Sequence, residues 1–400
     1  MVTTVPKTLT DGVPGPVTAP ESVSVAGSVP EIVTDRSGRQ LKVHRAWPKD
    51  GGRLTFEASD VENDQIRAGT IEPDGRVRVS PFAEDPVLAG LPGAAAQGQL
   101  LVHRYKRRAV VRDAVGFTKL LAPGRAEGVA ASHRLMGELT QPSGIVMPDV
   151  VGQLSASVTL AAVRGVSFHE LGQGLTGPVR SGQVSPGQSS LQQPSFEQVL
   201  SPEDMWEQAW QQWAVRWPRL AVSPVASGRP ELLNHSTGDE VRTVSRWVNQ
   251  VQQFGALPVS AERLQTASSQ VARLLISGAP QSAVLSHRDL HDKQLLFNAD
   301  SGAIGLIDCD TVSVAEPALD LANLLVHIDF RRAQGVFSAA TASTAEQAIL
   351  ETASVMNVAD TRLHAYSVST KLRLACLYAF RPAYRTVAHR WFERLEEDLA

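Results

Sequence analysis

The chain has 400 residues, of which 43% are hydrophobic and 20% are charged, and its formal net charge at pH 7 is −3. This length exceeds what one hydrophobic core usually serves, so two lobes or domains are expected, and the small negative charge gives no electrostatic reason to expect a nucleic-acid partner. No run of about 20 apolar residues is present, so neither a membrane-spanning helix nor a membrane partner is expected.

The first segment, residues 1–35, is rich in Pro, Thr, Val and Gly, which predicts a flexible leader. It lacks the basic head and apolar stretch of a signal peptide. The chain has two cysteines, Cys309 and Cys376, which exclude a disulfide framework and favour a reducing compartment. Together these features indicate a cytoplasmic protein.

Residues 40–120 contain short runs in which apolar and polar residues alternate, separated by Gly, Pro, Asp and Asn. This pattern predicts a mostly antiparallel sheet. The basic run HRYKRR, residues 103–108, is interpreted as a solvated strand edge protected by charge. A helix is expected over residues 124–139, and two more strand-like segments follow at 144–154 and 156–165.

Residues 172–198 are rich in Gly, Ser, Pro and Gln and show no periodicity, which predicts a loop or linker. Beyond it the pattern becomes helical. Ser201 is expected to be a helix N-cap, with Pro202 at the first helical position. The aromatic stripe at Trp206, Trp210 and Trp213 is interpreted as hydrophobic core. More helices are expected up to the C-terminus, interrupted by one short β segment.

That β segment is SHRDLHDKQLLF followed by GLIDCDTVSVAEP, residues 286–297 and 305–317. Leu295–Phe297 and Ile304–Ile307 have the right length for a hairpin, and the residues between them supply the turn. A hairpin brings the residues before its first strand close to those after its second strand. It therefore gathers several oxygen-bearing side chains at one end: Asp289, Gln294, Asp308 and Asp310. Because carboxylates repel each other, Mg²⁺ is the natural candidate to stabilise them.

These two motifs resemble the catalytic segment of the aminoglycoside phosphotransferase and choline kinase superfamily, relatives of the protein kinases. The matching residues are His287, Asp289, Gln294, Asp308 and Asp310, and Asp320 in PALDLANLL matches the acidic residue that opens the next helix. Gln294 stands where most members have Asn, a feature similar to maltokinase-like proteins. The resemblance implies an α+β, protein-kinase-like two-lobe fold, with a small antiparallel-sheet N-lobe and a larger helical C-lobe.

The resemblance also implies the activity and the roles of these residues. It implies that ATP or GTP donates its γ-phosphoryl group to a hydroxyl of a small molecule, with Mg²⁺ as cofactor. Asp289 is then the catalytic base, and Asp308 holds the metal. Gln294 becomes a second metal ligand, and Asp310 a further ligand or a neighbouring carboxylate. His287 and Asp320 support the shape of the catalytic loop.

A nucleotide-binding N-lobe is expected over residues 36–160 and the C-lobe over 161–400. The strands before about residue 95 exceed what such a lobe needs, which is consistent with an added N-terminal subdomain. Lys119 is the candidate for the nucleotide phosphates, with Glu127 favoured over Glu138 as its partner. No Gly-rich phosphate loop precedes Lys119. The segment that resembles the adenine-binding hinge consists of Leu160, Ala161, Ala162 and Val163, followed by a bend at Gly165.

The acceptor is expected to be a sugar, an aminoglycoside-like antibiotic or another metabolite, bound by the C-lobe. Charged residues that could line its pocket are Asp329, Arg331, Arg332, Arg381 and Arg385. His291 and Asp292 are interpreted as solvated loop residues or substrate contacts. Two alternatives stay open: a catalytically weak, pseudokinase-like nucleotide-binding regulator, and a metal-dependent phosphohydrolase that uses His291 and Asp292 as metal ligands.

Overall fold

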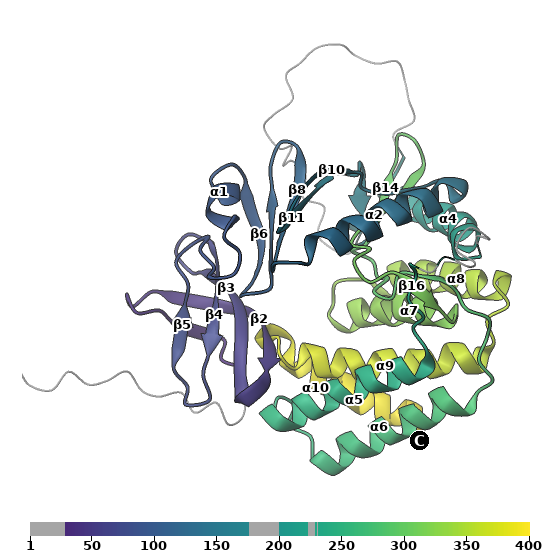
Figure 1. Ribbon diagram of the computed structural model, residues 1–400. Helices are drawn as coiled ribbons and strands as arrows, with labels where there is room; N and C mark the ends of the chain where they lie inside the picture. Colours follow the sequence, from purple (N-terminus) through teal and green to yellow (C-terminus); the bar gives the residue numbers. More distant parts are fainter. Residues whose placement is uncertain (1–28, 176–199, 223–228, 230) are drawn as a thin grey trace, which may run out of the picture.

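The computed structural model describes residues 29–175, 200–222, 229 and 231–400. Most of the predicted leader at 1–35, and most of the predicted linker at 172–198, lies outside the described residues. Sheets occupy the N-terminal part of the described chain and helices the C-terminal part (Figure 1). None of the described helices is long and apolar enough to cross a membrane.

The first sheet is an antiparallel meander at the purple end of the chain in Figure 1. Its strands are β1 (Ile32–Thr34), β2 (Gln40–Lys49), β3 (Arg53–Asp60), β4 (Ile66–Ile71) and β5 (Val77–Val79). Alternation along β2 turns Leu41 and Val43 inward, where they join Leu54 and Phe56 of β3 in the core. The strands before residue 95 thus form a sheet of their own.

The second sheet has the order β10-β11-β8-β7-β6, and each neighbouring pair is antiparallel. Its strands are β6 (Gln99–Arg104), β7 (Arg108–Arg112), β8 (Gly116–Leu121), β10 (Val150–Leu154) and β11 (Ser157–Ala161). The short helix α1 (Leu91–Ala95) precedes it, and α2 (Ala126–Thr140) follows β8. Lys119 lies on the central strand β8, opposite Val110 of β7 and Val158 of β11. This position gives the lysine fixed neighbours on both sides.

The predicted hairpin is confirmed. Strands β14 (Leu295–Asn298) and β15 (Ala303–Leu306) pair antiparallel, and Gly302 in the connecting turn has φ +65°. Two short strands complete this sheet, β9 (Ile145–Val146) and β12 (Val166–Ser167). Strand β13 (Val284–Ser286) precedes the hairpin in the chain and β16 (Ser313–Ala315) follows it, and the two strands pair with each other. They hold together the two chain segments that carry the catalytic motifs.

Helices build the rest of the molecule: α3 (Phe168–Gly174), α4 (Pro202–Ala221), α5 (Thr237–Phe254), α6 (Ala261–Ser277), α7 (Ala318–Ala333), α8 (Ala339–Val355), α9 (Asp360–Tyr378) and α10 (Arg385–Leu399). The predicted N-cap of α4 is confirmed, because the Ser201 side chain accepts from the backbone N–H of Asp204 at 3.0 Å. The tryptophan stripe of α4 is core, as predicted: Trp206, Trp210 and Trp213 are all buried.

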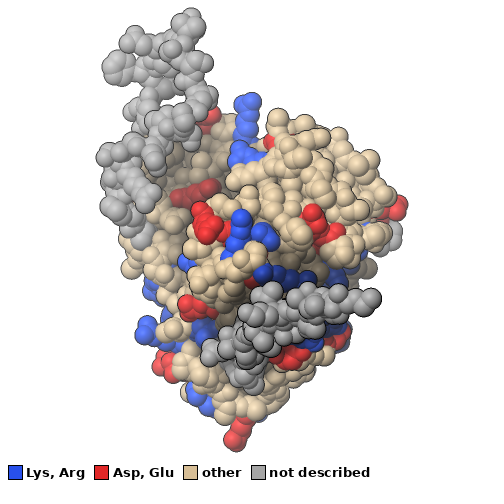
Figure 2. Space-filling model, turned by 90° about the vertical axis from the view of Figure 1, so that its left-hand side faces the viewer, with Lys and Arg blue, Asp and Glu red and all other residues tan. Residues whose placement is uncertain are grey.

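The first sheet also contacts the helical region. The backbone N–H of Ala46 in β2 donates to the carbonyl of Phe380 at the end of α9, at 2.8 Å. Across the face drawn in Figure 2, basic and acidic side chains are interspersed. An α+β fold with an antiparallel-sheet N-terminal region and a helical C-terminal region, predicted from the sequence, is confirmed.

Candidate active site

The loop before the hairpin is held by hydrogen bonds from buried side chains. Asp320, in the first turn of α7, accepts from the backbone N–H of His287 at 2.6 Å and of Arg288 at 2.8 Å. The His287 ring lies 3.0 Å from the carbonyl of Ile307 through Nε2, and its Nδ1 lies 3.3 Å from the backbone nitrogen of Asp289. Nε2 therefore donates and Nδ1 accepts, which is the pattern of a neutral ring. The two side chains fix the backbone that leads into Asp289.

Two residues in these loops have left-handed backbone conformations, Arg288 with φ +67° and Asp308 with φ +63°. For residues other than glycine such a conformation costs on the order of 1–3 kcal/mol. The bonds from Asp320 and the pairing of β13 with β16 hold the loops in place against this cost. Strain of this kind clusters at functional sites, where it fixes side-chain direction.

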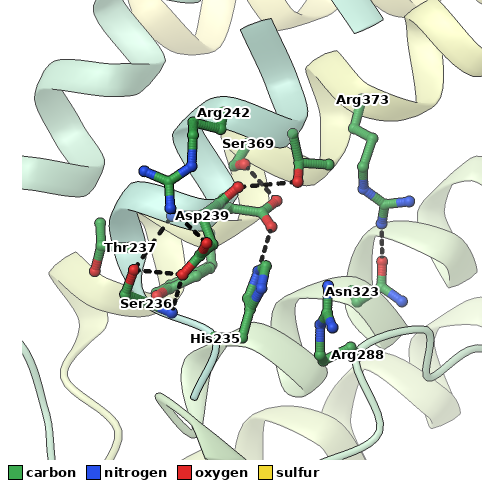
Figure 3. A network of polar contacts seen from close by, with 12 residues as sticks. His235, Ser236, Thr237, Asp239, Arg242, Arg288, Asn323, Ser369 and Arg373 are labelled. Atoms are coloured by element: carbon green, nitrogen blue, oxygen red, sulfur yellow. Dashed lines mark hydrogen bonds and ion pairs between the residues drawn. The ribbon is translucent and has the colours of Figure 1, made fainter. Parts of the chain in front are cut away.

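The residues that flank the hairpin face one cavity of about 430 Å³. Asp289, Gln294 and Asp308 all line it, as the hairpin geometry predicts. Behind this wall, Asn323 of α7 donates to the carbonyl of Leu290 at 2.7 Å and accepts from Arg373 of α9 (Figure 3). The helices thus directly contact the loop that carries Asp289. The chemical roles of the lining residues stay predictions.

Lys119 forms ion pairs with both acidic residues that follow the hairpin. Its Nζ lies 2.7 Å from Asp308 Oδ1 and 2.6 Å from Asp310 Oδ1. Burial by itself would lower the pKa of Lys119, but the two carboxylates outweigh burial and raise it. The lysine is therefore positively charged and joins the sheet to the hairpin end.

The expected pairing of Lys119 with a glutamate of α2 is not found. Glu127 is exposed beside a separate surface hollow, and Glu138 lies 3.3 Å from Arg229. The residue of α2 that reaches the site is His133, which is buried and has Nε2 3.3 Å from Asp310 Oδ1. The glutamates are six and five residues away from His133, so they lie on other faces of a helix with 3.6 residues per turn.

Sequence reasoning missed His133, although a signal was present. Ala130, His133 and Met136 recur every three residues along α2, and all three are buried. A histidine at the spacing of core residues, on a helix that follows a lysine-bearing strand, is therefore a candidate site residue. Glu127 and Glu138 are both exposed on this helix.

The donor set fits Mg²⁺ bound together with phosphates better than a preformed metal cluster. Among the described residues, no three His, Cys, Asp or Glu side chains are grouped so that they could hold a metal. Gln294 and Asp308 offer an amide and a carboxylate oxygen to the cavity, and Mg²⁺ usually takes one or two carboxylates plus substrate phosphates and water. Asp310, in contrast, is absent from the described cavity lining and is occupied by Lys119 and His133. The arrangement favours Asp310 as a counter-ion and argues against the phosphohydrolase alternative.

The interpretation of Asp292 as solvated is wrong, whereas His291 is partly buried and lines the cavity, so its role as a substrate contact stays a prediction. Asp292 is fully buried and forms a two-bond ion pair with Arg331, at 2.9 Å to Nε and 3.0 Å to Nη2. The ring of His169 lies 2.5 Å from the same carboxylate, and the ring of His291 packs against His327 with centroids 4.8 Å apart. In the sequence His291 and Asp292 lie in a polar turn, and no local pattern indicates that α7 and α3 cover this turn.

Acid is expected to remove the stabilising contribution of Asp292. Burial by itself would raise the pKa of this carboxyl, but Arg331 and His169 outweigh burial and hold the pKa well below its usual value of about 4. Because the folded-state pKa is depressed, the contribution is complete above the unfolded-state value and is lost as pH falls through the folded-state pKa. The difference in free energy of unfolding between wild type and Asp292→Asn should therefore shrink as pH is lowered toward 3. Urea unfolding across this range measures it, and a constant difference would contradict a charged Asp292.

The predicted hinge residues border a second hollow of about 280 Å³. Ala161 and Val163 line it together with Gly305 of β15, whereas the side chain of Leu160 is buried in the sheet. Gly165 has φ +131°, and a Cβ there would lie 2.7 Å from the carbonyl oxygen of Phe297, so the bend needs glycine. The role of these residues in nucleotide binding stays a prediction.

Residues 101–353 match the model of the phosphotransferase enzyme family. Because the match covers more than half of the chain, the chain belongs to this family. The predicted superfamily, its kinase-like α+β fold and the predicted enzyme class, a small-molecule phosphotransferase with a hydroxyl acceptor, are thereby confirmed. The maltokinase-like feature at Gln294 stays a prediction. No curated protein matches the chain.

Several solved structures are similar to this chain. The macrolide 2′-phosphotransferase MphH from Brachybacterium faecium is 16% identical, with a TM-score of 0.40, and the match covers 76% of this chain and 97% of that one. A GDP complex of aminoglycoside 2′-phosphotransferase-IIIa is 14% identical, with a TM-score of 0.48 and coverages of 78% and 95%. A choline/ethanolamine kinase family protein from Mesorhizobium loti is 12% identical, with a TM-score of 0.43 and coverages of 78% and 92%.

Proposed function

We propose that the protein is an ATP- or GTP-dependent phosphotransferase that moves the γ-phosphoryl group to a hydroxyl of a small molecule. The observation that carries this proposal is the convergence of Asp289, Gln294 and Asp308 on one cavity, with Lys119 bonded to Asp308. Family membership supplies the reaction class. Residues 36–160 then form the nucleotide-binding lobe and residues 161–400 the lobe that carries the catalytic loop.

In the proposed reaction Asp289 acts on the acceptor. The acceptor oxygen forms a bond to the γ-phosphorus while the bond from that phosphorus to the bridging oxygen of the nucleotide breaks, and Asp289 takes the hydroxyl proton. The backbone that carries Asp289 is held by His287 and Asp320, so the carboxylate needs little reorganisation to reach the acceptor.

The donor side is built around Lys119. Its ammonium group is set to contact the nucleotide phosphates, with Asp310 and His133 as its support. Mg²⁺ held by Asp308 and Gln294 would neutralise charge on these phosphates. Backbone groups of Ala161 to Val163 would meet the base. We infer a cytoplasmic setting, which is consistent with Cys309 and Cys376 both being free and buried.

A coupled assay of ADP or GDP release tests the proposal. Purified protein with Mg²⁺ and nucleotide is expected to release diphosphate nucleotide faster when a suitable hydroxyl compound is added. The panel should contain neutral sugars, sugar phosphates, sugar acids and aminoglycosides. Thermal stabilisation by Mg-ATP without turnover of any acceptor would instead favour the nucleotide-binding regulator, and the absence of both effects would refute nucleotide chemistry.

Replacing Gln294 with leucine is expected to weaken metal binding selectively. Loss of one oxygen ligand should raise the Mg²⁺ concentration for half-maximal activity by about tenfold or more, since even outer partners of metal ligands contribute that much. Titration of Mg²⁺ at fixed nucleotide measures the effect. Gln347→Leu on the exposed face of α8 is the matched control. An unchanged Mg²⁺ dependence would exclude Gln294 as a ligand.

A further inference from the structure

The cavity that contains Asp289 is lined largely by cationic side chains. Its described lining includes seven of them, Arg45, Arg104, Arg108, Lys293, Arg331, Arg373 and Arg381, against the two carboxylates Asp289 and Asp308. The outer face drawn in Figure 2 has interspersed charges, so this set is not the continuation of a basic surface there. Of the basic run at residues 103–108, interpreted as a solvated strand edge, Lys106 and Arg107 are exposed, whereas Arg104 and Arg108 line this cavity.

Three of these cations are neutralised by protein carboxylates. Arg331 pairs with Asp292, Arg45 with Glu57 at 2.8 Å, and Arg108 with Asp310 at 3.7 Å.

The candidate acceptor residues that do not line the cavity are engaged elsewhere. Asp329 and Arg332 pair with each other, and Arg385 bonds the carbonyl of Val29.

Four cations have no carboxylate within ion-pair distance among the described residues: Arg104, Lys293, Arg373 and Arg381. Arg104 lies over the ring of Trp47 at 4.7 Å, and Arg381 over the ring of Tyr378 at 4.0 Å. Arg373 bonds only to the neutral amide of Asn323 (Figure 3). These contacts orient the guanidinium groups without a direct carboxylate partner, although the charge of Arg373 also acts on the buried carboxylate of Glu240.

Burial and the neighbouring like charges both act on the pKa of these arginines. Burial, and then repulsion from Arg107, Arg108 and Arg45, lowers the pKa of Arg104 to about 9. Burial also lowers the pKa of Arg381, and Arg45 and Arg331 add to the effect. Like charges gathered in a partly buried space are destabilising unless an anion joins them. The cavity is therefore complementary to negative charge.

Only part of the predicted nucleotide site belongs to this cavity, namely Gln294 and Asp308, the candidate Mg²⁺ ligands. Lys119, the candidate for the nucleotide phosphates, and the hinge residues Ala161 and Val163 lie outside the described cavity lining. The cavity walls come from β2, β6, β7, α5, α7, α9 and the loops that flank the hairpin, with Trp47 and Trp247 as aromatic surfaces. A volume of about 430 Å³ is in the range of small-ligand pockets.

We propose that the acceptor is an anionic hydroxy compound, such as a sugar phosphate or a sugar acid. Its anionic group binds Arg104, Arg373 and Arg381, and this contact presents a hydroxyl to Asp289. The identity of the acceptor class rests on the proposed phosphotransfer, whereas the anion site itself does not. Polycationic aminoglycosides are repelled by the same charges.

Calorimetric titration of the nucleotide-free protein tests the anion site. Inorganic phosphate and glucuronate are expected to bind, whereas neutral glucose and cationic kanamycin bind far more weakly. Arg381→Gln and Arg104→Gln should each weaken anion binding by about tenfold or more, the loss expected for one charged hydrogen-bond donor. Arg381→Lys should recover part of the affinity. Exposed Arg390→Gln should leave it unchanged.

Several results would overturn the anion site. One is the absence of measurable binding of either anion. Another is anion binding that is lost in Lys119→Met but kept in Arg381→Gln, which would show that the anion occupies the nucleotide phosphate site. Relative affinities of phosphate and glucuronate decide between a phosphorylated and a carboxylated acceptor. In the ADP-release assay, a neutral sugar or aminoglycoside as the best acceptor would refute the anionic acceptor while the phosphotransfer proposal stands. Anion binding at Arg381 without any nucleotide turnover would refute phosphotransfer alone.

Discussion

Asp289→Asn is expected to reduce phosphoryl transfer by about two to four orders of magnitude, the range for removal of a positioned general base. The replacement keeps the size of the side chain, and the bond to His287 is made by the backbone nitrogen, so the loop should keep its shape. Nucleotide affinity should stay close to that of wild type because Lys119 and the hinge are untouched. Single-turnover kinetics and nucleotide titration measure the two quantities separately.

Asp300→Asn provides the matched control for this change. Asp300 lies exposed in the turn of the same hairpin, away from the catalytic end, and should behave like wild type. Comparable rates from Asp289→Asn and wild type would exclude Asp289 as the base. Loss of nucleotide binding in Asp289→Asn would indicate that this carboxylate acts on the donor side instead.

Arg331→Met is expected to lower the free energy of unfolding by about 3–5 kcal/mol, the cost of leaving a buried ion without its partner. The methionine fills much of the vacated space, so the loss reports the uncompensated charge of Asp292. The adjacent Arg332→Met is the control. Arg332 is 45% exposed and pairs with Asp329 on the surface of α7, which is worth about 0–1 kcal/mol.

Urea unfolding of both variants measures this difference. Equal losses of unfolding free energy in Arg331→Met and Arg332→Met would show that the buried Asp292–Arg331 pair stabilises the fold no more than the surface pair does. The double replacement Asp292→Leu with Arg331→Met should recover most of the lost stability, because an apolar pair of similar volume can replace a buried ion pair. Failure of the double variant to recover would assign the loss to packing instead.

The hairpin and its carboxylates could be predicted because the information is local. A turn between two short apolar runs fixes which residues share an end, and the spacing of Asp289, Gln294 and Asp308 around it leaves little freedom. The burial of the α4 tryptophans likewise follows from helical spacing alone. In these segments, residues that are close in the sequence are also close in space.

The rest depends on contacts between distant segments. His133, and not Glu127, reaches Asp310 because of the face that α2 turns toward the sheet. Only tertiary packing sets the rotation of α2 about its own axis. The partner of Asp292 lies 39 residues away on α7. Arg104 and Arg381 meet in one cavity across most of the chain length, so no local pattern could reveal their common surroundings.

The hydrogen bond from Ala46 to Phe380 joins two stretches that both lie outside the family match at residues 101–353. Those stretches also supply Arg45, Trp47, Arg373 and Arg381 to the cavity wall. The proposed acceptor site is thus built partly from residues outside the family match, and changes there can alter the acceptor without altering the loop that carries Asp289. Two proteins that share the loop around Asp289 therefore need not share a substrate.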